Sequence, residues 1–497
     1  MPIPLKALLA EANLRAGSPV PPDLQITSVT EDSRRCGPGV LFVAIEGNAA
    51  DGNQFLADAA GRGAAAALVG HRDGVPTPLP CIQVDNPRRA LALCAHRLAG
   101  DPSRKMTVVG ITGTNGKTTV AYMMESIFKA AGMEPGVLTT VNMRWKGKIE
   151  VANQTTPSPT VIADRMARMQ ADGVRAVAME VSSHALDQHR CDGIRFAAGA
   201  LTNFTQDHLD YHKDMPTYKK AKERFFTEVL AANPEAVAVL NIDDAAGREF
   251  RNSSLSRRKI GYSLSHGTTD LSVRSLRCHT RGGMKITASW EGREIEIDTP
   301  LTGLFNAINC LTATALSLAV GIDIDAIREG LARMTGAPGR FERVDAGQPF
   351  PIIVDYAHTP DSLEQLLLNA RGLARRRLIA VFGCGGDRDP LKRPLMGQAA
   401  ARLAHQIIIT NDNPRTEPPE SIAKAIADGV KQSIGPDQKW EILLDRRAAI
   451  RRAVAMAQKG DVVVLAGKGH EDYQIVGKEK HHFDDREEAK AAVKAIS

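Results

Sequence analysis

The pattern of apolar and polar residues changes its period near residue 113. Residues 106–112 ("MTVVGIT") form a β-branched apolar run that predicts a buried strand. Residues 120–132 predict a helix that ends at Gly132, because apolar side chains recur there at helical spacing: Val120, Met123, Met124, Ile127, Phe128 and Ala131. A turn rich in glycine and threonine therefore joins a strand to a helix.

Strands and helices alternate in the same way along most of the chain. Before this turn come "GVLFVAI" (39–45) and "PRRALALCAHRLAG" (87–100), and after it come "RAVAMEV", "FAAGALTNF" and "EAVAVLNID". From residue 351, helical stretches separate the apolar segments "PIIVDY", "RLIAVFG", "HQIIIT", "KWEILLD" and "DVVVLAG". Strands separated by helices of about 10–15 residues predict a parallel, doubly wound sheet.

Two kinds of segment interrupt this alternation. "MKITASW" and "REIEIDTPL" have a period of two on either side of Glu291-Gly292 and predict a hairpin. "DPSRK" (101–105) and "TGAPGRFERVDAGQP" (335–349) are candidate linkers, so the 497 residues divide into three α/β domains. We expect a smaller N-terminal α/β domain (1–103), a central domain with a mostly parallel sheet (104–336) and a C-terminal Rossmann-like doubly wound domain (337–497).

The composition is that of a globular protein, with 43% hydrophobic and 24% charged residues. Aromatic residues make up only 4% of the chain, so a protein that stacks bases of nucleic acid is not expected. The net charge of +6 is mild for this length, and a small anionic substrate explains it as well as nucleic acid does. We interpret the basic clusters as solvated helix faces and ends: residues 375–377, and Arg446, Arg447, Arg451 and Arg452.

Cysteine usage and hydropathy indicate the compartment. The seven cysteines are scattered without C-x-x-C spacing, which argues against a disulfide framework and a zinc site and favours a reducing compartment. No apolar run approaches the roughly 18 residues of a membrane span, and the N-terminus lacks a signal-peptide pattern. We therefore expect a cytoplasmic protein with no membrane partner.

The segment "GITGTNGKTT" (110–119) has the context of a phosphate-binding loop. It follows a strand and opens a helix, where backbone N–H groups and the helix N-terminus bind phosphates. Lys117 would lie along the β- and γ-phosphates, and the Thr118 hydroxyl would ligate Mg²⁺. Five residues separate Gly110 from Gly116, one more than in the usual motif. A simple glycine-rich turn is the alternative, but it does not explain Gly-Lys-Thr-Thr at this place.

Three further residues are candidates for the same site. Glu180 ends the strand "RAVAMEV", where a carboxylate can hold Mg²⁺ beside a phosphate loop, although a surface acid is the alternative. In "TNFTQDHLDYHKDM" (202–215), His208 is assigned to Mg²⁺ or phosphate rather than zinc, because no third zinc ligand is suitably spaced, and His212 is assigned a structural role. Spacing alone predicts an ordinary surface lysine at Lys222, within the amphipathic "TYKKAKERFF".

Together, these motifs resemble the Mur ligase family: ATP-dependent amide-bond-forming enzymes of peptidoglycan synthesis that are related to folylpolyglutamate synthase. The resemblance covers essentially the whole chain. It rests on "GTNGKTT", "EVSSHALDQHR", "TNFTQDHLDYH", "YKKAKERFF", "GRFERV", "DYAHTPDSLE", "GCGGDRDPLKRPLMG" and "GKGHEDYQ", in this order. It implies an N-terminal domain for the UDP end of the substrate, a central P-loop-type ATPase domain, and a C-terminal domain that brings the amino acid.

The resemblance also implies site residues. ATP would bind Gly113, Thr114, Asn115, Gly116, Lys117, Thr118, Thr119, Asn306, Arg340 and Asp355. The UDP-muropeptide would bind Ser33, Asn48, Ala49, Gln154, Thr155, Thr156, Ser182, Gln188 and Arg190. Thr118, Glu180, His208 and a carbamylated Lys222 would hold Mg²⁺, and Lys117, Lys222 and His208 would act in catalysis.

Arg415, in "DNPR" (412–415), bears on the amino acid that is added. Diaminopimelate differs from lysine by a second amino-acid head with an extra carboxylate, which a guanidinium binds through two parallel hydrogen bonds. "DNPR" resembles the diaminopimelate-adding members, and an arginine in solvent is the alternative. The implied diaminopimelate site comprises Arg388, Asp412, Asn413, Pro414, Arg415, Gly467 and Glu471.

The function that the resemblance implies is ATP-dependent addition of meso-2,6-diaminopimelate to the D-glutamate γ-carboxylate of UDP-N-acetylmuramoyl-L-Ala-D-Glu. The reaction would pass through an acyl phosphate in cytoplasmic peptidoglycan precursor synthesis, and the family expectation is a monomer. Alternatives within the family are a lysine-adding Mur ligase, the ligase of the next step and a folylpolyglutamate synthase-like ligase. An alternative of another class is a nucleotide-dependent switch or binding protein, which would leave Glu180 and Lys222 unexplained.

Overall fold

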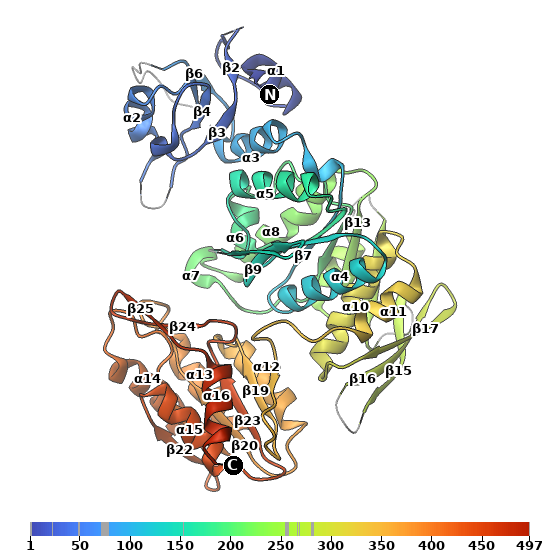
Figure 1. Ribbon diagram of the computed structural model, residues 1–497, viewed down its shortest axis with the longest axis vertical. Helices are drawn as coiled ribbons and strands as arrows, with labels where there is room; N and C mark the ends of the chain where they lie inside the picture. Colours follow the sequence, from blue (N-terminus) through green and yellow to red (C-terminus); the bar gives the residue numbers. More distant parts are fainter. Residues whose placement is uncertain are drawn as a thin grey trace. The chain divides into compact units, whose positions relative to one another are not determined.

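The computed structural model describes residues 2–21, 23–47, 50–70, 79–152, 154–253, 258–265, 267, 269–279 and 283–496. The chain forms two compact units (Figure 1). The first unit comprises Met1–Phe204 and Tyr211–Met334, and the second comprises Thr205–Asp210 and Thr335–Ser497. No helix in these described ranges is long and apolar enough to cross a membrane.

The first unit begins with a parallel four-stranded sheet in the order β3-β4-β5-β6. Its strands are β3 (Ser28–Thr30), β4 (Val40–Val43), β5 (Ala66–Val69) and β6 (Cys81–Gln83). The helices around it are α1 (Leu5–Glu11), α2 (Leu56–Gly61) and α3 (Pro87–Leu98). Helix α3 starts sharply because the Asn86 side chain accepts a hydrogen bond from the Arg89 N–H and Pro87 occupies the first turn. It packs against both this sheet and α5 (Pro159–Ala171).

An eleven-stranded sheet forms the rest of the first unit, in the order β10-β9-β8-β11-β7-β12-β13-β14-β15-β16-β17. Its parallel centre consists of β8 (Pro135–Leu138), β11 (Ala176–Glu180), β7 (Thr107–Thr112), β12 (Ala198–Leu201), β13 (Val237–Asn241) and β14 (Lys259–Ser263). At one end β9 (Asn142–Trp145) and β10 (Lys148–Val151) are antiparallel. At the other end β15 (Leu271–Cys278) pairs parallel with β14, and β16 (Met284–Trp290) and β17 (Arg293–Thr299) then follow as antiparallel strands. The mostly parallel α/β sheet predicted from the sequence is confirmed.

Helices cover both faces of this sheet. Val109 and Ile111 of β7 enter one hydrophobic core, with α4 (Lys117–Ala130), α10 (Leu304–Ala319) and α11 (Ile324–Ala332). Val108 enters the other core, with α5 and the segment after α8 (Met215–Arg224). The predicted strand, turn and helix around residue 113 are confirmed, and Gly132 has the left-handed φ of a helix C-terminus (67°).

The predicted hairpin is also confirmed, and its turn is unusual. Glu291 and Gly292 join β16 to β17 as a two-residue loop, and both have positive φ, 49° and 78°. Two successive left-handed residues are the requirement of the turn that matches the twist of a hairpin. Asparagine or aspartate is more common than glutamate at the first position, so the signal in the sequence came from Gly292 and the period-two flanks.

The second unit has a six-stranded sheet in the order β18-β19-β23-β20-β21-β22. The strands are β18 (Glu342–Val344), β19 (Ile352–Asp355), β23 (Val462–Ala466), β20 (Leu378–Phe382), β21 (Gln406–Ile409) and β22 (Lys439–Ile442), and only β18 pairs antiparallel. Ile379 and Val381 face the core formed with α15 (Arg446–Met456) and α16 (Asp485–Lys494). The alternate residues of β20 are buried as well, under the layer of α12 (Pro360–Arg371), α13 (Lys392–Leu403) and α14 (Pro419–Ser433). The sheet is therefore doubly wound, as predicted.

One interpretation of the basic clusters is wrong. Arg446 is not on a solvated helix end, because its side chain is 0% exposed and pairs with Asp485, which is also 0% exposed. The sequence places Arg446 in the first turn of a helix, but it does not reveal that this turn lies under the sheet.

His96 is a second buried polar residue that the sequence did not single out. It lies on α3, is 0% exposed and packs against Gly193. Neither ring nitrogen has a hydrogen-bond partner within the described ranges. Burial lowers the pKa of His96 to about 4, so the imidazole is neutral at pH 7.

Replacing His96 with leucine is expected to reduce the loss of stability in mild acid. Unfolded histidine takes up a proton below its ordinary pKa of 6.5, whereas folded His96 does so only near pH 4. The stability that depends on neutral His96 is therefore complete above pH 6.5 and decreases as the pH falls, by about 2 kcal/mol at pH 5. Urea unfolding at pH 7 and pH 5 should show a loss about 2 kcal/mol smaller in His96→Leu. Equal losses in the two proteins would contradict this.

Candidate active site

The phosphate-type loop lies between β7 and α4 and is held in place by the end of β12. Lys117 Nζ donates to the carbonyl oxygens of Gly113 (2.9 Å) and Thr114 (2.8 Å). The Asn115 N–H donates to Asn203 Oδ1 (2.9 Å). At Gly113, φ is 144° and a Cβ would lie 1.9 Å from Thr202 Oγ1, so no other residue fits there. The loop is therefore a fixed structure whose backbone conformation depends on glycine.

Glu180 and Thr118 come together beneath this loop. Glu180 is 1% exposed and Thr118 is 3% exposed, so the alternative of a surface acid at Glu180 is wrong. Glu180 Oε1 accepts hydrogen bonds from Thr118 Oγ1 (2.9 Å) and from the Thr140 N–H (2.9 Å). A carboxylate and a hydroxyl next to a phosphate-type loop form the oxygen donor set that Mg²⁺ prefers, so these residues fit the ion.

Lys222 is buried, which corrects the prediction of a surface lysine. It lies on α8, is 2% exposed, and its Nζ donates to Gly113 O (2.8 Å). The ammonium also lies 4.8 Å from the ring centroid of Tyr218. Lys117 and Lys222 therefore donate to the same carbonyl oxygen of the loop, and both are positioned by it.

The helix turn after Lys222 explains how α8 packs closely against the sheet. Residues Phe225–Val229 form a π-helical turn, which is often found at functional sites. The Phe225 ring fills space over two glycines of the sheet: a Cβ at Gly110 or at Gly199 would lie 2.6 Å from it. The absence of side chains on β7 and β12 at these positions lets α8 pack closely enough for Lys222 to reach the loop.

A cluster of polar side chains lies beyond the carboxyl end of β11. Arg190 donates to Gln188 Oε1 (2.6 Å), to Thr156 O (2.9 Å) and to Gln154 Oε1. Thr156 Oγ1 donates to Glu180 O (2.8 Å) and accepts from the Ser182 N–H (3.0 Å). Thr155 accepts a hydrogen bond from Thr140, which also binds Glu180. The predicted muropeptide residues of this region are therefore brought together, and they continue directly to Glu180.

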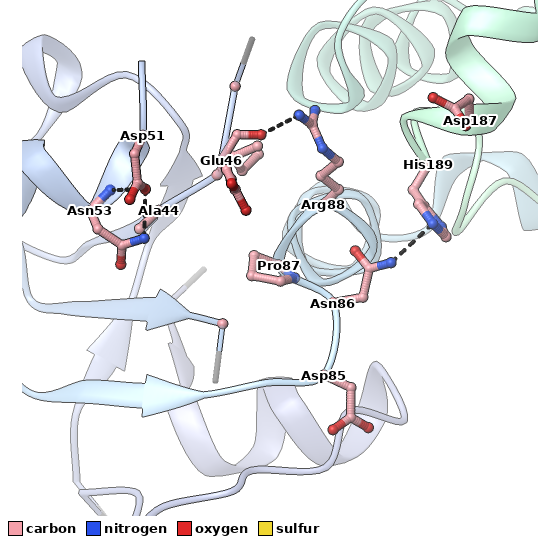
Figure 2. Close-up of a pocket in the computed structure, with 13 residues that line it drawn as sticks. Ala44, Glu46, Asp51, Asn53, Asp85, Asn86, Pro87, Arg88, Asp187 and His189 are labelled. Atoms are coloured by element: carbon pink, nitrogen blue, oxygen red, sulfur yellow. Dashed lines mark hydrogen bonds between the residues drawn. The ribbon is translucent and has the colours of Figure 1, made fainter. Parts of the chain in front are cut away.

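Two cavities extend from this cluster toward the N-terminal sheet. One, of about 370 Å³, is lined by Gln154, Gln188 and Arg190 together with Glu31 and Arg88. The other, of about 800 Å³, lies at the carboxyl ends of β4, β5 and β6 (Figure 2). Ligands of open α/β sheets bind outside the carboxyl ends of the strands, so both cavities are candidate substrate sites.

The larger cavity contains polar residues that the sequence analysis missed. Figure 2 shows Arg88 directed at the main-chain oxygen of Glu46 (2.5 Å) and Asn86 directed at His189 (2.9 Å). Ser33, predicted for the uridine end, is 7% exposed and begins a short 3₁₀ turn after β3. Asn48 and Ala49, predicted for the same end, lie outside the described residues. His189 belongs to the segment "EVSSHALDQHR", on which the family resemblance partly rests. Its contact with Asn86 could not be predicted, because the two residues are 103 positions apart in the sequence.

Asp192 connects this cavity to the helix of Lys222. It accepts hydrogen bonds from Arg224 NH2 (2.7 and 2.9 Å), and His189 Nδ1 lies 3.1 Å from it. Burial alone would raise the pKa of Asp192, but the hydrogen bonds of His189 and Arg224 lower it below its usual value. Arg224 follows Lys222 by two positions, so a continuous polar chain joins Asn86 to α8.

The remaining predicted ATP residues, and His208 of the predicted Mg²⁺ site, divide between the two units. Asn306, in α10 of the first unit, accepts a hydrogen bond from Asn309 (3.2 Å), and Asn309 Oδ1 lies 2.4 Å from a Cβ built at Gly116 of the loop. Arg340, Asp355 and His208 belong to the second unit. There Asp355 accepts from the Phe341 N–H (2.6 Å), the Arg340 guanidinium lies 4.8 Å from the Tyr356 ring, and His208 lies 3.4 Å from Asp207.

The predicted amino-acid residues form one cluster beyond β20, β21 and β23. Asn413 Nδ2 donates to Glu471 Oε2 (2.9 Å), and Asp412 Oδ2 lies 2.5 Å from a Cβ built at Gly467. Arg415 NH1 donates to Gly386 O (2.7 Å), and Gly385 lies between Arg415 and the exposed Arg388. Arg388 and Arg415 therefore flank Gly385, and the carboxylates of Asp412 and Glu471 lie near Gly467 and Asn413 in the same cluster.

Lys468 is a member of this cluster that the sequence analysis missed. It is 0% exposed, and its Nζ lies 3.3 Å from Asn413 Oδ1 and 3.2 Å from Glu471 Oε2. Burial and the nearby Asp412 carboxylate raise the pKa of Glu471, while Lys468 and Asn413 oppose this shift. Arg415 itself has a left-handed φ of 52°, with its N–H bonded to Ile475 O (3.1 Å) and its carbonyl bonded to the Gly477 N–H (2.8 Å). These bonds hold Arg415 in the cluster, which disagrees with the alternative of a freely solvated arginine.

Comparison with known proteins supports the resemblance. Three family models match: "Mur ligase family, catalytic domain" at residues 25–97, "Mur ligase middle domain" at 111–317 and "Mur ligase, glutamate ligase domain" at 339–469. The UDP-N-acetylmuramoyl-L-alanyl-D-glutamate–2,6-diaminopimelate ligase of Bacillus cereus is 40% identical over 472 residues, 94% of each chain. The ligase of the same name from Synechococcus elongatus is 43% identical over 479 residues, 95% of this chain and 94% of that one.

The chain belongs to the Mur ligase family. As a Mur ligase it is an ATP-dependent amide-bond-forming enzyme, which removes the alternative of a nucleotide-dependent switch. A solved UDP-N-acetylmuramoyl-L-alanyl-D-glutamate–2,6-diaminopimelate ligase has a TM-score of 0.71 at 30% identity and covers 100% of this chain and 99% of its own. MurF from Acinetobacter baumannii has a TM-score of 0.62 at 18% identity, covering 94% and 95%, and shares the Mur ligase fold.

Proposed function

We propose that this Mur ligase adds meso-2,6-diaminopimelate to the γ-carboxylate of D-glutamate in UDP-N-acetylmuramoyl-L-Ala-D-Glu, in cytoplasmic peptidoglycan precursor synthesis. The relatives of known name, about 40% identical over nearly the whole chain, support this substrate pair. The observation that carries the proposal is the clustering of Arg388, Arg415, Asp412 and Glu471 on loops that follow the neighbouring strands β20, β21 and β23. Two guanidinium groups and two carboxylates are suited to bind an amino-acid head, which has one carboxylate and one ammonium group.

The chemistry begins with transfer of the ATP γ-phosphoryl group to the glutamate γ-carboxylate, which releases ADP and gives an acyl phosphate. The amine of the incoming amino acid then attacks the acyl carbon, loses a proton and expels inorganic phosphate. Lys117 and the N–H groups at the start of α4 would bind the transferring phosphoryl oxygens. Because Lys117 is held by two loop carbonyls, its charge is positioned before the nucleotide binds.

Mg²⁺ would be held by Thr118 and Glu180, with His208 and a carbamylated Lys222 as further ligands. When bound, Mg²⁺ neutralises charge on the phosphate oxygens. Carbamylation converts the Lys222 cation into an anion with two oxygen acceptors. The carbamate keeps one N–H, which can still donate to Gly113 O, so the residue need not leave its present position to be modified.

The two cavities of the first unit would hold the UDP-muropeptide. Arg190, Gln188 and Gln154 would bind its peptide end close to Glu180, and the larger cavity beside Arg88 and His189 would take the nucleotide end. ATP, the muropeptide and diaminopimelate would be the partners, with no nucleic acid or membrane, and the protein would act as a monomer.

Phosphate release and product mass test this function. Purified protein receives Mg-ATP and UDP-MurNAc-L-Ala-D-Glu with meso-diaminopimelate, with L-lysine or with no amino acid. We expect turnover only with diaminopimelate, and a product heavier by one such residue. A preference for lysine would agree with ligase activity but would contradict the proposed amino-acid substrate. Phosphate release that ignores the muropeptide would overturn the function.

A further inference from the structure

Arg446 is among the largest side chains that are fully buried in the molecule. It occupies the first turn of α15, and Asp485 occupies the first turn of α16. Arg446 Nε and NH2 donate to the two carboxylate oxygens of Asp485 (2.7 and 2.6 Å), which fixes the plane of the guanidinium. With 0% exposure, Arg446 cannot contact a substrate directly.

The remaining donors of Arg446 bind two main-chain carbonyls. NH1 donates to Asn411 O (3.1 Å), and NH2 donates to Ala466 O (3.0 Å). Asn411 immediately precedes Asp412 and leads into the segment with Asn413 and Arg415, whereas Ala466 immediately precedes Gly467 and leads into the segment with Glu471. One side chain therefore holds the starting points of both loops that contribute to the amino-acid cluster.

The strand order shows what this link adds. The two loops follow β21 and β23, and β20 lies between these strands. The ladder sets the spacing of β21 and β23 through β20, but it does not set the positions of the loops that continue beyond the strand ends. Arg446 binds a carbonyl at the start of each loop and so connects the two loops directly. Lys468 and Glu471 make a second connection between the same loops through Asn413.

Stability alone does not account for a buried ion pair at this place. Removing two charges from water is expensive, and an apolar pair of similar volume is often equally or more stable. What an apolar pair cannot do is donate hydrogen bonds to Asn411 and Ala466. Arg446 also places a positive charge near Asp412 and Glu471, which lie close enough to interact with it.

We propose that Arg446 is a positioning residue for the amino-acid pocket, which holds the loops after β21 and β23 at the separation that Asn413, Arg415 and Glu471 need to bind the amino acid. This inference rests on the proposed function of the cluster. Arg446 affects binding through geometry, so its loss should raise the KM for the amino acid while leaving the KM for ATP and for the UDP-muropeptide unchanged.

The test is Arg446→Lys with Arg377→Lys as its matched control. Lysine keeps the charge but cannot donate to Asp485 twice and to two carbonyls at once. Arg377 pairs with Asp461 (2.6 Å), which is 0% exposed, and donates to Met456 O (2.8 Å). This pair lies at the amino ends of β20 and β23, away from the cluster. We expect Arg446→Lys to raise the amino-acid KM at least about 10-fold, with the other two KM values within about twofold, and Arg377→Lys to change none of them.

A second variant removes the risk of an unpaired buried charge. In the double variant Arg446→Met, Asp485→Leu, the pair becomes apolar, so the fold should be retained while the two carbonyls lose their donor. The same selective rise in KM is expected. If neither variant folds, hydrogen exchange in the wild-type protein decides: the amides of Arg415 and Gly467 should exchange as slowly as those of β23. Rapid exchange there would overturn the proposal.

The outcomes separate this inference from the proposed function. A wild-type protein that joins neither diaminopimelate nor lysine to the muropeptide contradicts the proposed function. A wild-type protein that does so, with an unchanged amino-acid KM in folded variants, contradicts the role of Arg446 alone. An equal rise in all three KM values would also contradict it, because it would indicate a general structural effect.

Discussion

A variant with methionine at position 222 is expected to lose about 10²–10³-fold in kcat while it still binds ATP. Lys222 is buried and bonded to Gly113 O, the same oxygen that positions Lys117. Methionine has a similar length and fills the same space, so the loop and Tyr218 keep their packing. What is lost is the nitrogen, and with it both the bond to the loop and the carbamate that the proposed function requires.

Two comparisons make this prediction specific. Lys220→Met changes an exposed lysine on the same helix and should retain full activity. In buffer depleted of CO₂, the wild-type enzyme should lose activity that bicarbonate restores, whereas Lys222→Met should not respond. Wild-type activity that is indifferent to CO₂ would contradict carbamylation, and full activity in Lys222→Met would contradict any catalytic role.

Replacing Arg415 with alanine is expected to raise the KM for diaminopimelate about 10²–10³-fold, with the KM for ATP unchanged. Among the residues that the structure describes, the guanidinium donates to Gly386 O alone, so its other donors can bind a carboxylate. The left-handed backbone at residue 415 is equally unfavourable for arginine, lysine and alanine, and its two main-chain bonds do not involve the side chain. The rise in KM should therefore result from loss of the guanidinium rather than from a change in the loop backbone.

Arg415→Lys distinguishes the guanidinium from its charge. An ammonium cannot form two parallel hydrogen bonds, so we expect a rise in KM of about 10-fold or more even in this variant. Arg402→Ala is the control, because Arg402 lies exposed on α13 and pairs with Glu364 at the surface (2.7 Å). Steady-state kinetics with varied diaminopimelate is the measurement. An unchanged KM in Arg415→Ala would overturn the assignment of this loop.

The sequence predicted those parts of the fold that depend on local patterns. The strand, glycine-rich turn and helix around Lys117 follow from apolar periodicity and glycine placement, and so does the hairpin at Glu291-Gly292. Glu180 was placed at a strand end because the apolar run stops there. Parallel strands present their carboxyl ends at one edge, so the meeting of Glu180 with Thr118 could be expected as well.

Burial of charged residues could not be predicted in the same way. Arg446 belongs to a basic cluster that looks solvated, since the periodicity of a helix does not show what lies beneath its first turn. Lys222 depends on two glycines of other strands, Gly110 and Gly199, whose missing side chains admit Phe225. The contact of Asn86 with His189 joins positions 103 apart. Each of these is a tertiary contact without a local signal.

If the proposed pocket binds the amino acid, exchange of its side chains alone is expected to change which amino acid this scaffold adds. The loops after β23, β20 and β21 leave the sheet side by side, and they bear Glu471, Arg388 and Arg415 respectively. Arg446 binds the starting points of the loops after β21 and β23, so we expect directed evolution to sample these codons together with Asn413 without moving that framework. A library that keeps Arg446 and Asp485 constant would consist mostly of folded members, and selection could then act on the chemistry of the pocket.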